Sequence, residues 1–396
     1  MAKKLILFLF FVLVTQNFKS QNVNILDAKF SPTSNIIALI VGDNRNTDIR
    51  LYFSEKNELS QNLIADSLKQ TTVREFEFSP EGDKIALLLT TNMITDLFLY
   101  EIENRKLIRC TNSNDLKNYN LDFAYKNSLI WCDNQNVIFL SKHSGLVQQY
   151  IFNFTKKTFE ANGASNGNEY FLTYSRKNQE SYYIAGINNR EPSVYRRKLG
   201  STVNLEISKD GNNHMTTILS DNNNYLFYSV MPVISPCIYD LNSSKLVKTK
   251  LPKSNIRVIG WVEKDTNIVY TFSHFESDEN FPVTDLFSYN YLTQKKRLIS
   301  NGIEPNFGVL CSPDGTKIIY TKTSKPSSFS PNQKKYKLEE SQTFISDNKG
   351  TNTNLSCYGL AKDWSIDNKT VVFVNGNNLV ILDVDSGNKK SIQIEN

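Results

Sequence analysis

Histidines are the first residues in this chain to examine for chemistry, because imidazole nitrogens bind transition metals and transfer protons near neutral pH. Only three are present, far apart in the sequence: His143, His214 and His274. A metal site would require their ring nitrogens to converge to about 2.1 Å from one ion. The alternative, which we favour, is that all three are surface loop histidines without a metal.

Two short motifs resemble catalytic or metal-binding patterns. Residues 163–167 read Gly-Ala-Ser-Asn-Gly, the GxSxG pattern that places a nucleophilic serine on a strand-to-helix turn in hydrolases. No helical pattern follows, so we expect an ordinary loop. Residues 383–388 resemble part of a calcium loop but lack its third acidic position and its distal glutamate. We therefore expect a hairpin turn there, and neither a catalytic residue nor a cofactor.

Cysteine chemistry is also disfavoured. The chain has five cysteines, widely spaced and without a CxxC pair: Cys110, Cys132, Cys237, Cys311 and Cys357. This pattern is too sparse for a disulfide framework and does not match a zinc site. We expect these residues to behave as small buried apolar side chains.

The first 20 residues (1–20) are typical of a secretory signal peptide. Lys3 and Lys4 precede an unbroken apolar run, Leu5–Val14, which is too short to span a bilayer. We expect cleavage after Ser20 and a periplasmic or secreted location. Without this segment 42 basic residues face 40 acidic ones, and the net charge falls from +5 to +2. We therefore expect no nucleic-acid partner, and the lack of a second long apolar stretch predicts no stable membrane insertion.

A repeat runs through the rest of the chain. Its clearest copies are AKFSPTSNIIAL from Ala28, FEFSPEGDKIAL from Phe76 and VLCSPDGTKIIY from Val309. Each copy is the end of a strand, a Ser-Pro turn and a strand of alternating apolar residues. We call the position before the turn the aromatic slot. Over the whole chain, at intervals of 42 to 53 residues, this slot holds Phe30, Phe78, Trp131, Tyr174, Leu219, Trp261, Cys311 and Trp364.

The repeat predicts an all-β fold. A mean interval of about 48 residues suits four short antiparallel strands. One such sheet cannot bury both of its faces, whereas eight sheets arranged radially can. We therefore predict a single β-propeller over residues 21–396 with eight four-stranded blades. Seven blades are the alternative, because the copies at Tyr174 and Leu219 are weak, and the first strand (22–30) and the last (390–395) are expected to meet at the closure of the ring.

The Ser-Pro-Asp/Glu-Gly turn resembles the WD-like repeat of TolB-type propellers, which also builds the propellers of prolyl-oligopeptidase-type and dipeptidyl-peptidase-type enzymes. It stands here at 79–82, at 312–315 and, degraded, at 31–34. The eight copies leave no room for the separate α/β domain of TolB-type proteins or the hydrolase domain of the peptidases. The resemblance implies an extracytoplasmic binding scaffold without an inherited active site. Some TolB-like propellers are polyuronate lyases that hold a metal with histidines near the axis, which keeps the three histidines as metal candidates.

Strand parity predicts which loops share a face of the propeller. The connections between second and third strands then lie on the same face as those between blades. The two longest, 273–285 and 322–341, belong to neighbouring blades six and seven, and long loops on a rigid scaffold commonly carry recognition. One is acidic and the other basic, and the candidate binding residues are Glu276, Asp278, Glu279, Asp285, Lys322, Lys325, Lys334, Lys335 and Lys337. They would form either a composite partner-binding surface or two solvated loops that pair weakly with each other.

Three functions are compatible with these observations. The leading hypothesis is a non-catalytic extracytoplasmic propeller that binds a protein or a cell-envelope component. The first alternative is a metal-dependent polyuronate lyase or another carbohydrate-active propeller enzyme, which needs at least two of the three histidines on one ion. The second alternative is a module that binds sugars or peptides by aromatic stacking. The sequence contains no signal for the oligomeric state.

Overall fold

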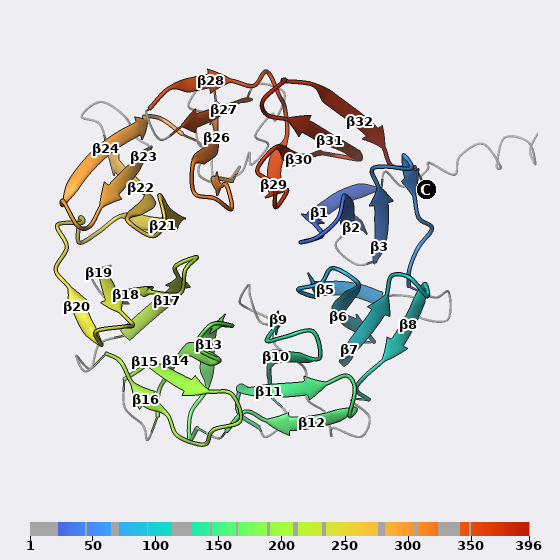
Figure 1. Cartoon of the computed structure of the whole chain (residues 1–396), viewed down its shortest axis with the longest axis horizontal. Helices are drawn as coiled ribbons and strands as arrows, with labels where there is room; N and C mark the ends of the chain where they lie inside the picture. The colour runs from blue at the N-terminus through green and yellow to red at the C-terminus, as the bar shows by residue number, and fades with distance from the viewer. Residues whose placement is uncertain are drawn as a thin grey trace, which may run out of the picture.

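The computed structural model describes residues 23–43, 46–64, 71–92, 94–112, 129–142, 145–163, 165–187, 191–208, 213–231, 235–275, 282–303, 308–323, 341–347 and 350–395. These residues form 32 strands and no helix. The strands make eight antiparallel sheets, each built from four consecutive strands in sequence order. Figure 1 shows the sheets as blades around an axis, with the first strand of a blade innermost. The prediction of an all-β propeller with eight four-stranded blades is confirmed, and the seven-blade alternative is wrong.

The strand bounds follow the repeat closely. Blades 1 to 4 consist of β1 (Asn24–Phe30), β2 (Ile36–Gly42), β3 (Thr47–Phe53), β4 (Glu58–Leu59), β5 (Thr71–Phe78), β6 (Lys84–Thr91), β7 (Ile94–Glu101), β8 (Lys106–Arg109), β9 (Leu129–Trp131), β10 (Asn136–Ser141), β11 (Gln148–Asn153), β12 (Thr158–Ala161), β13 (Glu169–Ser175), β14 (Glu180–Ala185), β15 (Ser193–Lys198) and β16 (Leu205–Glu206). Blades 5 to 8 consist of β17 (Asn213–Leu219), β18 (Tyr225–Met231), β19 (Ser235–Asp240), β20 (Lys245–Val247), β21 (Ile256–Val262), β22 (Asn267–Phe275), β23 (Pro282–Asn290), β24 (Lys295–Ser300), β25 (Leu310–Cys311), β26 (Lys317–Thr323), β27 (Ser341–Asp347), β28 (Asn352–Asn354), β29 (Leu360–Trp364), β30 (Thr370–Asn375), β31 (Asn378–Asp383) and β32 (Lys389–Gln393).

The core of the protein lies between the blades. Eight apolar clusters of buried side chains fill the eight interfaces between adjacent blades, including the interface between blade 8 and blade 1. The second strand of a blade is covered on both faces, which is why β6 has six consecutive buried residues, the apolar run Ile85–Leu89 followed by Thr90. Each fully buried large apolar side chain stabilises the fold by about 1.5–3 kcal/mol.

The three tryptophans occupy equivalent places in this core. Each packs against the preceding blade: Trp131 in the interface of blades 2 and 3, Trp261 in that of blades 5 and 6, and Trp364 in that of blades 7 and 8. Two of the indoles donate a hydrogen bond to the residue before the aromatic slot of the preceding blade. Trp131 Nε1 lies 2.9 Å from the Glu77 carbonyl oxygen, and Trp261 Nε1 lies 3.5 Å from that of Ile218. The shared partner position confirms that the repeat is aligned in the correct register.

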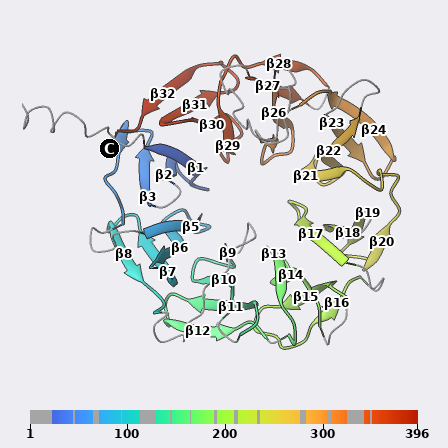
Figure 2. The ribbon, with the colours of Figure 1, turned by 180° about the vertical axis from the view of Figure 1, so that it is seen from behind.

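The ring closes without strand exchange. β1 is the inner strand of blade 1 and β32 the outer strand of blade 8, and the two do not pair. The two ends of the described chain do meet. Arg50 Nη1 of blade 1 donates to the Glu395 carbonyl oxygen at 2.8 Å, and Ile25 N donates to the Gly376 carbonyl oxygen at 2.8 Å. Figure 2 shows blade 8 packed beside blade 1 from the opposite face. The first and last strands thus meet at the closure through apolar packing and these side-chain and main-chain bonds, without pairing with each other.

The Ser-Pro-Glu-Gly turn of blade 2 shows why the repeat needs these residue types. The Ser79 hydroxyl donates to Asp83 Oδ1 at 2.7 Å and accepts a hydrogen bond from Lys84 N at 3.0 Å, which closes the turn. Gly82 has φ of +67°, and a Cβ there would lie 2.4 Å from the side-chain oxygens of Ser31 and Thr33 in blade 1. The glycine therefore permits both the left-handed backbone and the close approach of the neighbouring turn.

The described residues of the GxSxG segment, Gly163 and 165–167, lie in a loop, as expected, between β12 and β13 of blades 3 and 4. Ser165 is buried, its hydroxyl donates to the Gly167 carbonyl oxygen at 2.8 Å, and a strand rather than a helix follows. The same interface contains a fully buried ion pair between Arg197 Nη2 and Glu169 Oε1 at 2.6 Å.

Within the described part of the chain, no helix is long and apolar enough to cross a membrane.

Candidate functional site

The two faces of the propeller differ in the connections that they carry. The turns between first and second strands, together with those between third and fourth strands, form one face, which we call the turn face. The remaining connections, including the two long ones of blades 6 and 7, form the opposite face, which we call the loop face. The strand order of every blade fixes this assignment.

Hydrogen bonds between neighbouring blades run around the whole turn face, and we call them the turn belt. At this end of the inner strands, each of the eight interfaces carries at least one bond from one blade to the next. The pairs are Thr33 Oγ1 to Glu81 O (2.8 Å), Glu81 N to Asn134 Oδ1 (3.2 Å), Arg176 Nε to Trp131 O (3.1 Å), Lys177 Nζ to Asn224 Oδ1 (3.2 Å), Asn222 N to Asp265 Oδ2 (3.2 Å), Glu263 N to Gly315 O (3.0 Å), Asp314 N to Asn368 Oδ1 (2.9 Å) and Phe30 N to Asp363 Oδ2 (2.8 Å).

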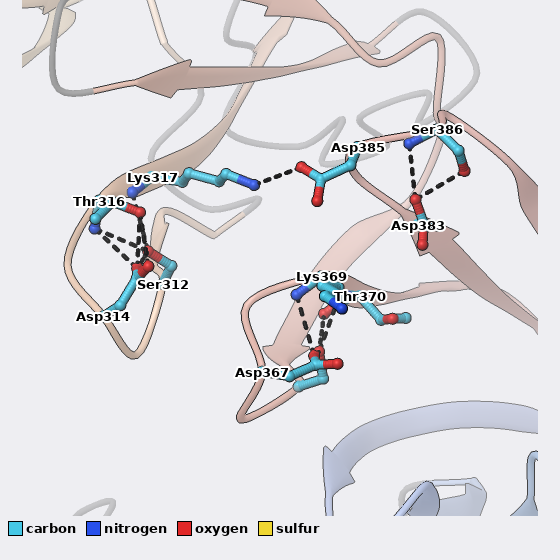
Figure 3. Close-up of polar contacts among 11 residues, drawn as sticks. Ser312, Asp314, Thr316, Lys317, Asp367, Lys369, Thr370, Asp383, Asp385 and Ser386 are labelled. Atoms are coloured by element: carbon cyan, nitrogen blue, oxygen red, sulfur yellow. Dashed lines mark hydrogen bonds and ion pairs between the residues drawn. The ribbon is translucent and has the colours of Figure 1, made fainter.

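Additional bonds stiffen single turns and link outer turns to the belt (Figure 3). In blade 7 the Ser312 hydroxyl donates to Asp314 Oδ1 at 2.6 Å, and Lys317 Nζ reaches Asp385 Oδ1 of blade 8 at 2.8 Å. Asp383 Oδ1 accepts hydrogen bonds from Ser386 N and Ser386 Oγ, each at 2.7 Å. The calcium-like segment 383–388 is therefore a hairpin turn, as its sequence predicts.

The residues before the aromatic slot form a ring at the turn-face end of the inner strands, which we call the mouth ring. All eight of its members are half-buried, and most of the slot residues beside them are buried. In blade order the mouth ring consists of Lys29, Glu77, Ile130, Thr173, Ile218, Gly260, Leu310 and Asp363. The three charged members come from the consecutive blades 8, 1 and 2, and the other five are uncharged. The mouth therefore has a charged arc and an uncharged arc.

The charged arc is held by contacts between blades. Lys29 Nζ contacts the Glu77 carboxylate of blade 2 and donates to the Phe76 carbonyl oxygen at 3.1 Å. Burial acts to lower the pKa of Lys29, but the negative charge of Glu77 raises it above its ordinary value, so the ammonium remains charged. The Asp363 carboxylate accepts a hydrogen bond from Phe30 N of blade 1, and burial raises its pKa to about 6.

A pocket of about 190 Å³ lies where the charged arc meets the uncharged arc. It is lined by the inner strands of blades 2, 3 and 4, through Glu77, Phe78, Leu129, Ile130, Trp131, Thr173, Tyr174 and Arg176. Trp131 fixes both walls, because its indole donates to the Glu77 carbonyl oxygen and its own carbonyl oxygen accepts a hydrogen bond from Arg176 Nε. Pockets for drug-sized ligands measure about 300–1,000 Å³. The smaller volume here suits one amino-acid side chain.

The candidate residues of the loop face are only partly within the described structure. Asp285 lies in β23, where Oδ2 is 2.9 Å from His274 Nε2 and Oδ1 accepts a hydrogen bond from Gly302 N at 3.1 Å. Ile303 N donates to the Thr284 carbonyl oxygen, and Ile303 also forms an isolated bridge with Lys322 of blade 7. The stems of the acidic and basic connections are therefore adjacent. The remaining candidates lie outside the described residues: Glu276, Asp278, Glu279, Lys325, Lys334, Lys335 and Lys337.

The histidines are also only partly described. His143 lies outside the described residues, and so does the side chain of His214, whose backbone pairs with Val230 near the start of β17. His274 lies near the end of β22, stacked on the Phe272 ring at 5.7 Å between ring centroids. Among the described side chains, no group of three potential metal ligands comes together.

None of the five cysteines forms a disulfide bond. Cys132 and Cys357 are buried and the other three are half-buried. Burial raises the pKa of the Cys110, Cys132 and Cys311 thiols to about 12, so these thiols are protonated at neutral pH. They act as packing residues, as the sequence predicts.

The mouth ring was not found by sequence reasoning, although the sequence carries its signal. Lys29, Glu77 and Asp363 interrupt apolar strand ends directly before the aromatic slot, where the aligned copies carry Ile130, Ile218 or Leu310. A charged residue at this position of consecutive repeats predicts a polar sector at the mouth, because the same position of every blade lies at the same height along the axis.

Comparisons with known proteins support the fold. Neither a protein-family model nor a curated protein matches this chain. An oligogalacturonate lyase in complex with manganese aligns with a TM-score of 0.55 and 10% identity, over 86% of this chain and 94% of that one. Dipeptidyl peptidase 4 of Porphyromonas gingivalis aligns with a TM-score of 0.57 and 11% identity, over 93% of this chain and 58% of its own. The WD40 domain of SCAP from fission yeast aligns with a TM-score of 0.55 and 12% identity, over 93% of each. These comparisons show the fold alone, a β-propeller, as the repeat predicts.

Proposed function

We propose that this protein is a non-catalytic scaffold that binds a protein or a cell-envelope component through the mouth of its turn face. The proposal rests on the combination of a continuous turn belt with a mouth ring that is charged on one side and has a pocket of side-chain size beside its charged arc. The signal-like segment 1–20 supports placing this scaffold in the periplasm or outside the cell.

Each part of the mouth contributes differently to binding. The turn belt keeps the surface in one arrangement, which reduces the entropy that association would otherwise cost. In protein interfaces, a few side chains that insert into pockets of the partner contribute most of the binding free energy. The pocket at the mouth can accept one such side chain. Charged groups on one side of the mouth orient a partner and disfavour the wrong ones. A rigid surface with one anchoring pocket and a polar rim suits recognition of a macromolecule.

The proposal is tested by affinity capture from a cell-envelope extract of the source organism. The immobilised wild type is compared with a mouth variant, Glu77→Gln with Arg176→Gln, and with a loop-face control, Phe275→Ser. Phe275 is 70% exposed, so its replacement leaves the core intact. We expect one partner to be retained by wild type and control and lost from the mouth variant. A partner that the mouth variant retains would refute the assignment, and so would the lack of any partner together with turnover of a substrate.

A second candidate is a metal-dependent lyase acting on polyuronates at the loop face. The observation that favours it is the contact between His274 Nε2 and Asp285 Oδ2, because a carboxylate commonly orients a metal-binding imidazole. The likeness to an oligogalacturonate lyase in complex with manganese adds support at the level of the fold. The test is manganese binding by the purified protein and by His274→Ala, with formation of unsaturated product from oligogalacturonate. Tight binding lost in the variant, with turnover, would establish the lyase and displace the scaffold.

A further inference from the structure

We propose that the mouth pocket binds a carboxylate side chain, glutamate or aspartate, presented by a partner polypeptide. The pocket is the one between the inner strands of blades 2, 3 and 4. This inference rests on the proposed function and names the chemistry of the anchoring residue. It is carried by three observations: which polar groups of the pocket are already engaged, which donors remain, and how the charges around them are balanced.

Most polar groups of the pocket already have a partner within the protein. The Glu77 carboxylate contacts Lys29 Nζ, and the Trp131 indole donates to the Glu77 carbonyl oxygen. The Tyr174 hydroxyl is hydrogen bonded to the Cys132 thiol. None of these groups needs a ligand to complete its hydrogen bonds.

The donors that remain belong to blade 4. Arg176 is exposed and uses Nε to donate to the Trp131 carbonyl oxygen at 3.1 Å. Within the described part of the chain its two terminal nitrogens make no hydrogen bond or ion pair, and neither does the Thr173 hydroxyl. A guanidinium whose Nε is fixed by a main-chain carbonyl presents its terminal nitrogens in a defined plane. This is the geometry that binds a carboxylate through two parallel hydrogen bonds.

The opposite wall suits the stem of such a side chain. Phe78, Leu129 and Ile130 provide apolar surface within the same pocket. Long acidic side chains place their methylene groups on apolar surface while the charged end reaches a polar partner. A volume of about 190 Å³ holds one side chain of this kind and excludes a folded segment.

The charges around the pocket favour an anion. Glu77 is the only acidic lining residue and contacts the ammonium of Lys29, which outside the pocket also faces Asp27, Glu75 and Asp363. The turn 176–179 carries Arg176 and Lys177 and no acid. The nearby Asp133 carboxylate caps its own turn, with Oδ1 accepting hydrogen bonds from Gln135 N at 2.7 Å and Asn136 N at 2.8 Å. A cationic side chain would be repelled by the guanidinium of Arg176. A purely apolar side chain would remove water from the guanidinium without offering it hydrogen bonds, which is unfavourable.

The test uses small probes and protein labelled with ¹⁵N at arginine. N-acetyl-glutamate N-methylamide is titrated while the Nε–Hε resonance of Arg176, assigned with Arg176→Gln, is followed by NMR. The matched probe is the glutamine analogue, and the control variant is Arg105→Gln, an exposed arginine of the same face. We expect a saturable shift with the acid and at least about tenfold weaker binding of the amide, because bonds between charged groups exceed neutral ones by this margin. Arg105→Gln should bind the acid like wild type.

Three results would overturn the proposal: no saturable shift with the acid, equal responses to acid and amide, or saturable binding of tri-galacturonate with none of the glutamate probe. The last would identify a uronate sugar as the occupant. If the probe fails while the envelope partner is still captured through the mouth, the carboxylate assignment is wrong and the scaffold function stands. If the probe binds at Arg176 and no partner is captured, the pocket chemistry stands and the scaffold function is wrong.

Discussion

Two interfaces of the ring, with the same architecture, are held by different chemistry. Between blades 5 and 6, the indole of Trp261 packs in the core and donates to the Ile218 carbonyl oxygen. Between blades 8 and 1, the Asp363 carboxylate accepts from Phe30 N, and Lys362 Nζ donates to the Leu26 carbonyl oxygen at 2.7 Å. At the closing interface the residue before the aromatic slot thus contributes an ionisable side chain, whereas the Trp261 contact is neutral, although the turn belt between blades 5 and 6 also contains the Asp265 carboxylate.

This difference shows that the repeat fixes where blades touch but not which bonds join them. The same position before the aromatic slot supplies a neutral carbonyl acceptor at Ile218 and a charged side chain at Asp363. The bond from the Trp261 indole to the Ile218 carbonyl oxygen keeps its strength as the pH changes, because neither of these two groups titrates. The closing interface is expected to weaken or strengthen with pH, because it contains carboxylate and ammonium groups. The experiments below separate the two kinds of interface.

The largest effect is expected for Trp261→Ala, which removes the buried indole between blades 5 and 6. The variant should lose about 3–5 kcal/mol of stability through lost burial and the cavity left behind. Equilibrium unfolding in urea measures the loss. The control is Leu246→Ala on the outer strand β20, which is 60% exposed and should change stability by less than about 0.5 kcal/mol. Equal losses for both variants would show that Trp261 does not join the blades.

The next effect is the pH dependence of the closing interface, measured as the stability of Asp363→Asn minus that of wild type. Burial raises the pKa of Asp363 to about 6, and the unfolded carboxyl group titrates near about 4. The folded state therefore holds the proton more tightly, and the stability that this group contributes is full below pH 4 and lost as the pH rises through 6. Asparagine can still accept the hydrogen bond from Phe30 N but does not titrate.

Between pH 4 and pH 7, the free energy of unfolding of Asp363→Asn should therefore rise by about 1–3 kcal/mol relative to that of wild type. Chemical unfolding at both pH values measures it. No shift would show that the carboxylate is well solvated. A shift in the opposite direction would show that its attraction to Lys29 outweighs burial.

A smaller effect compares two tryptophans of the same repeat position. Trp131 Nε1 donates to the Glu77 carbonyl oxygen, whereas Trp364 Nε1 is buried without a hydrogen-bond partner among the described residues. Replacing each with phenylalanine removes similar apolar area but breaks a hydrogen bond only at Trp131. Trp131→Phe should cost about 1 kcal/mol more than Trp364→Phe. Thermal and urea unfolding of both variants measure the gap, and a gap of zero or of opposite sign would contradict the assigned bond.

The smallest effect concerns the surface ion pair between Lys317 of blade 7 and Asp385 of blade 8 (Figure 3). Asp385 is 63% exposed, so solvent and salt screen the pair. Lys317→Gln should reduce stability by less than about 0.5 kcal/mol, with no measurable difference in high salt. Urea unfolding at low and high salt is the measurement. A loss above about 1 kcal/mol would show that this pair, and not only the core, joins the blades.

The sequence predicted the fold in detail because the repeat has a strong physical signature. Apolar alternation marks the strands, and the Ser-Pro turn with its glycine marks the boundary between the first two strands of a blade. The position of all three tryptophans in one slot fixed the register, which the bonds of Trp131 and Trp261 reproduce. The sequence predicted that the two ends of the ring meet but not which contacts join them, because packing between Ile25 and Val374 leaves no pattern in the sequence.

The candidate site was harder to predict, because it depends on residues from different blades. Glu77, Ile130 and Arg176 line one pocket although the outer two are 99 positions apart in the sequence. Sequence reasoning favoured the long loops of the opposite face, since length and charge are visible in a linear chain. A rigid surface made from short, uniform turns cannot be recognised in the sequence in this way, because its hydrogen bonds join side chains and main-chain groups of successive repeats.

If the mouth of the turn face is the binding surface, a photoreactive group placed beside it should become crosslinked to the partner. A photoreactive phenylalanine analogue replaces Glu81, an exposed turn residue of blade 2, or Phe275 on the loop face, and each protein is irradiated in envelope extract. We expect one specific adduct from position 81 that Arg176→Gln abolishes, and none from position 275. A specific adduct from position 275 alone, or the same adduct from position 81 with Arg176→Gln, would contradict this expectation.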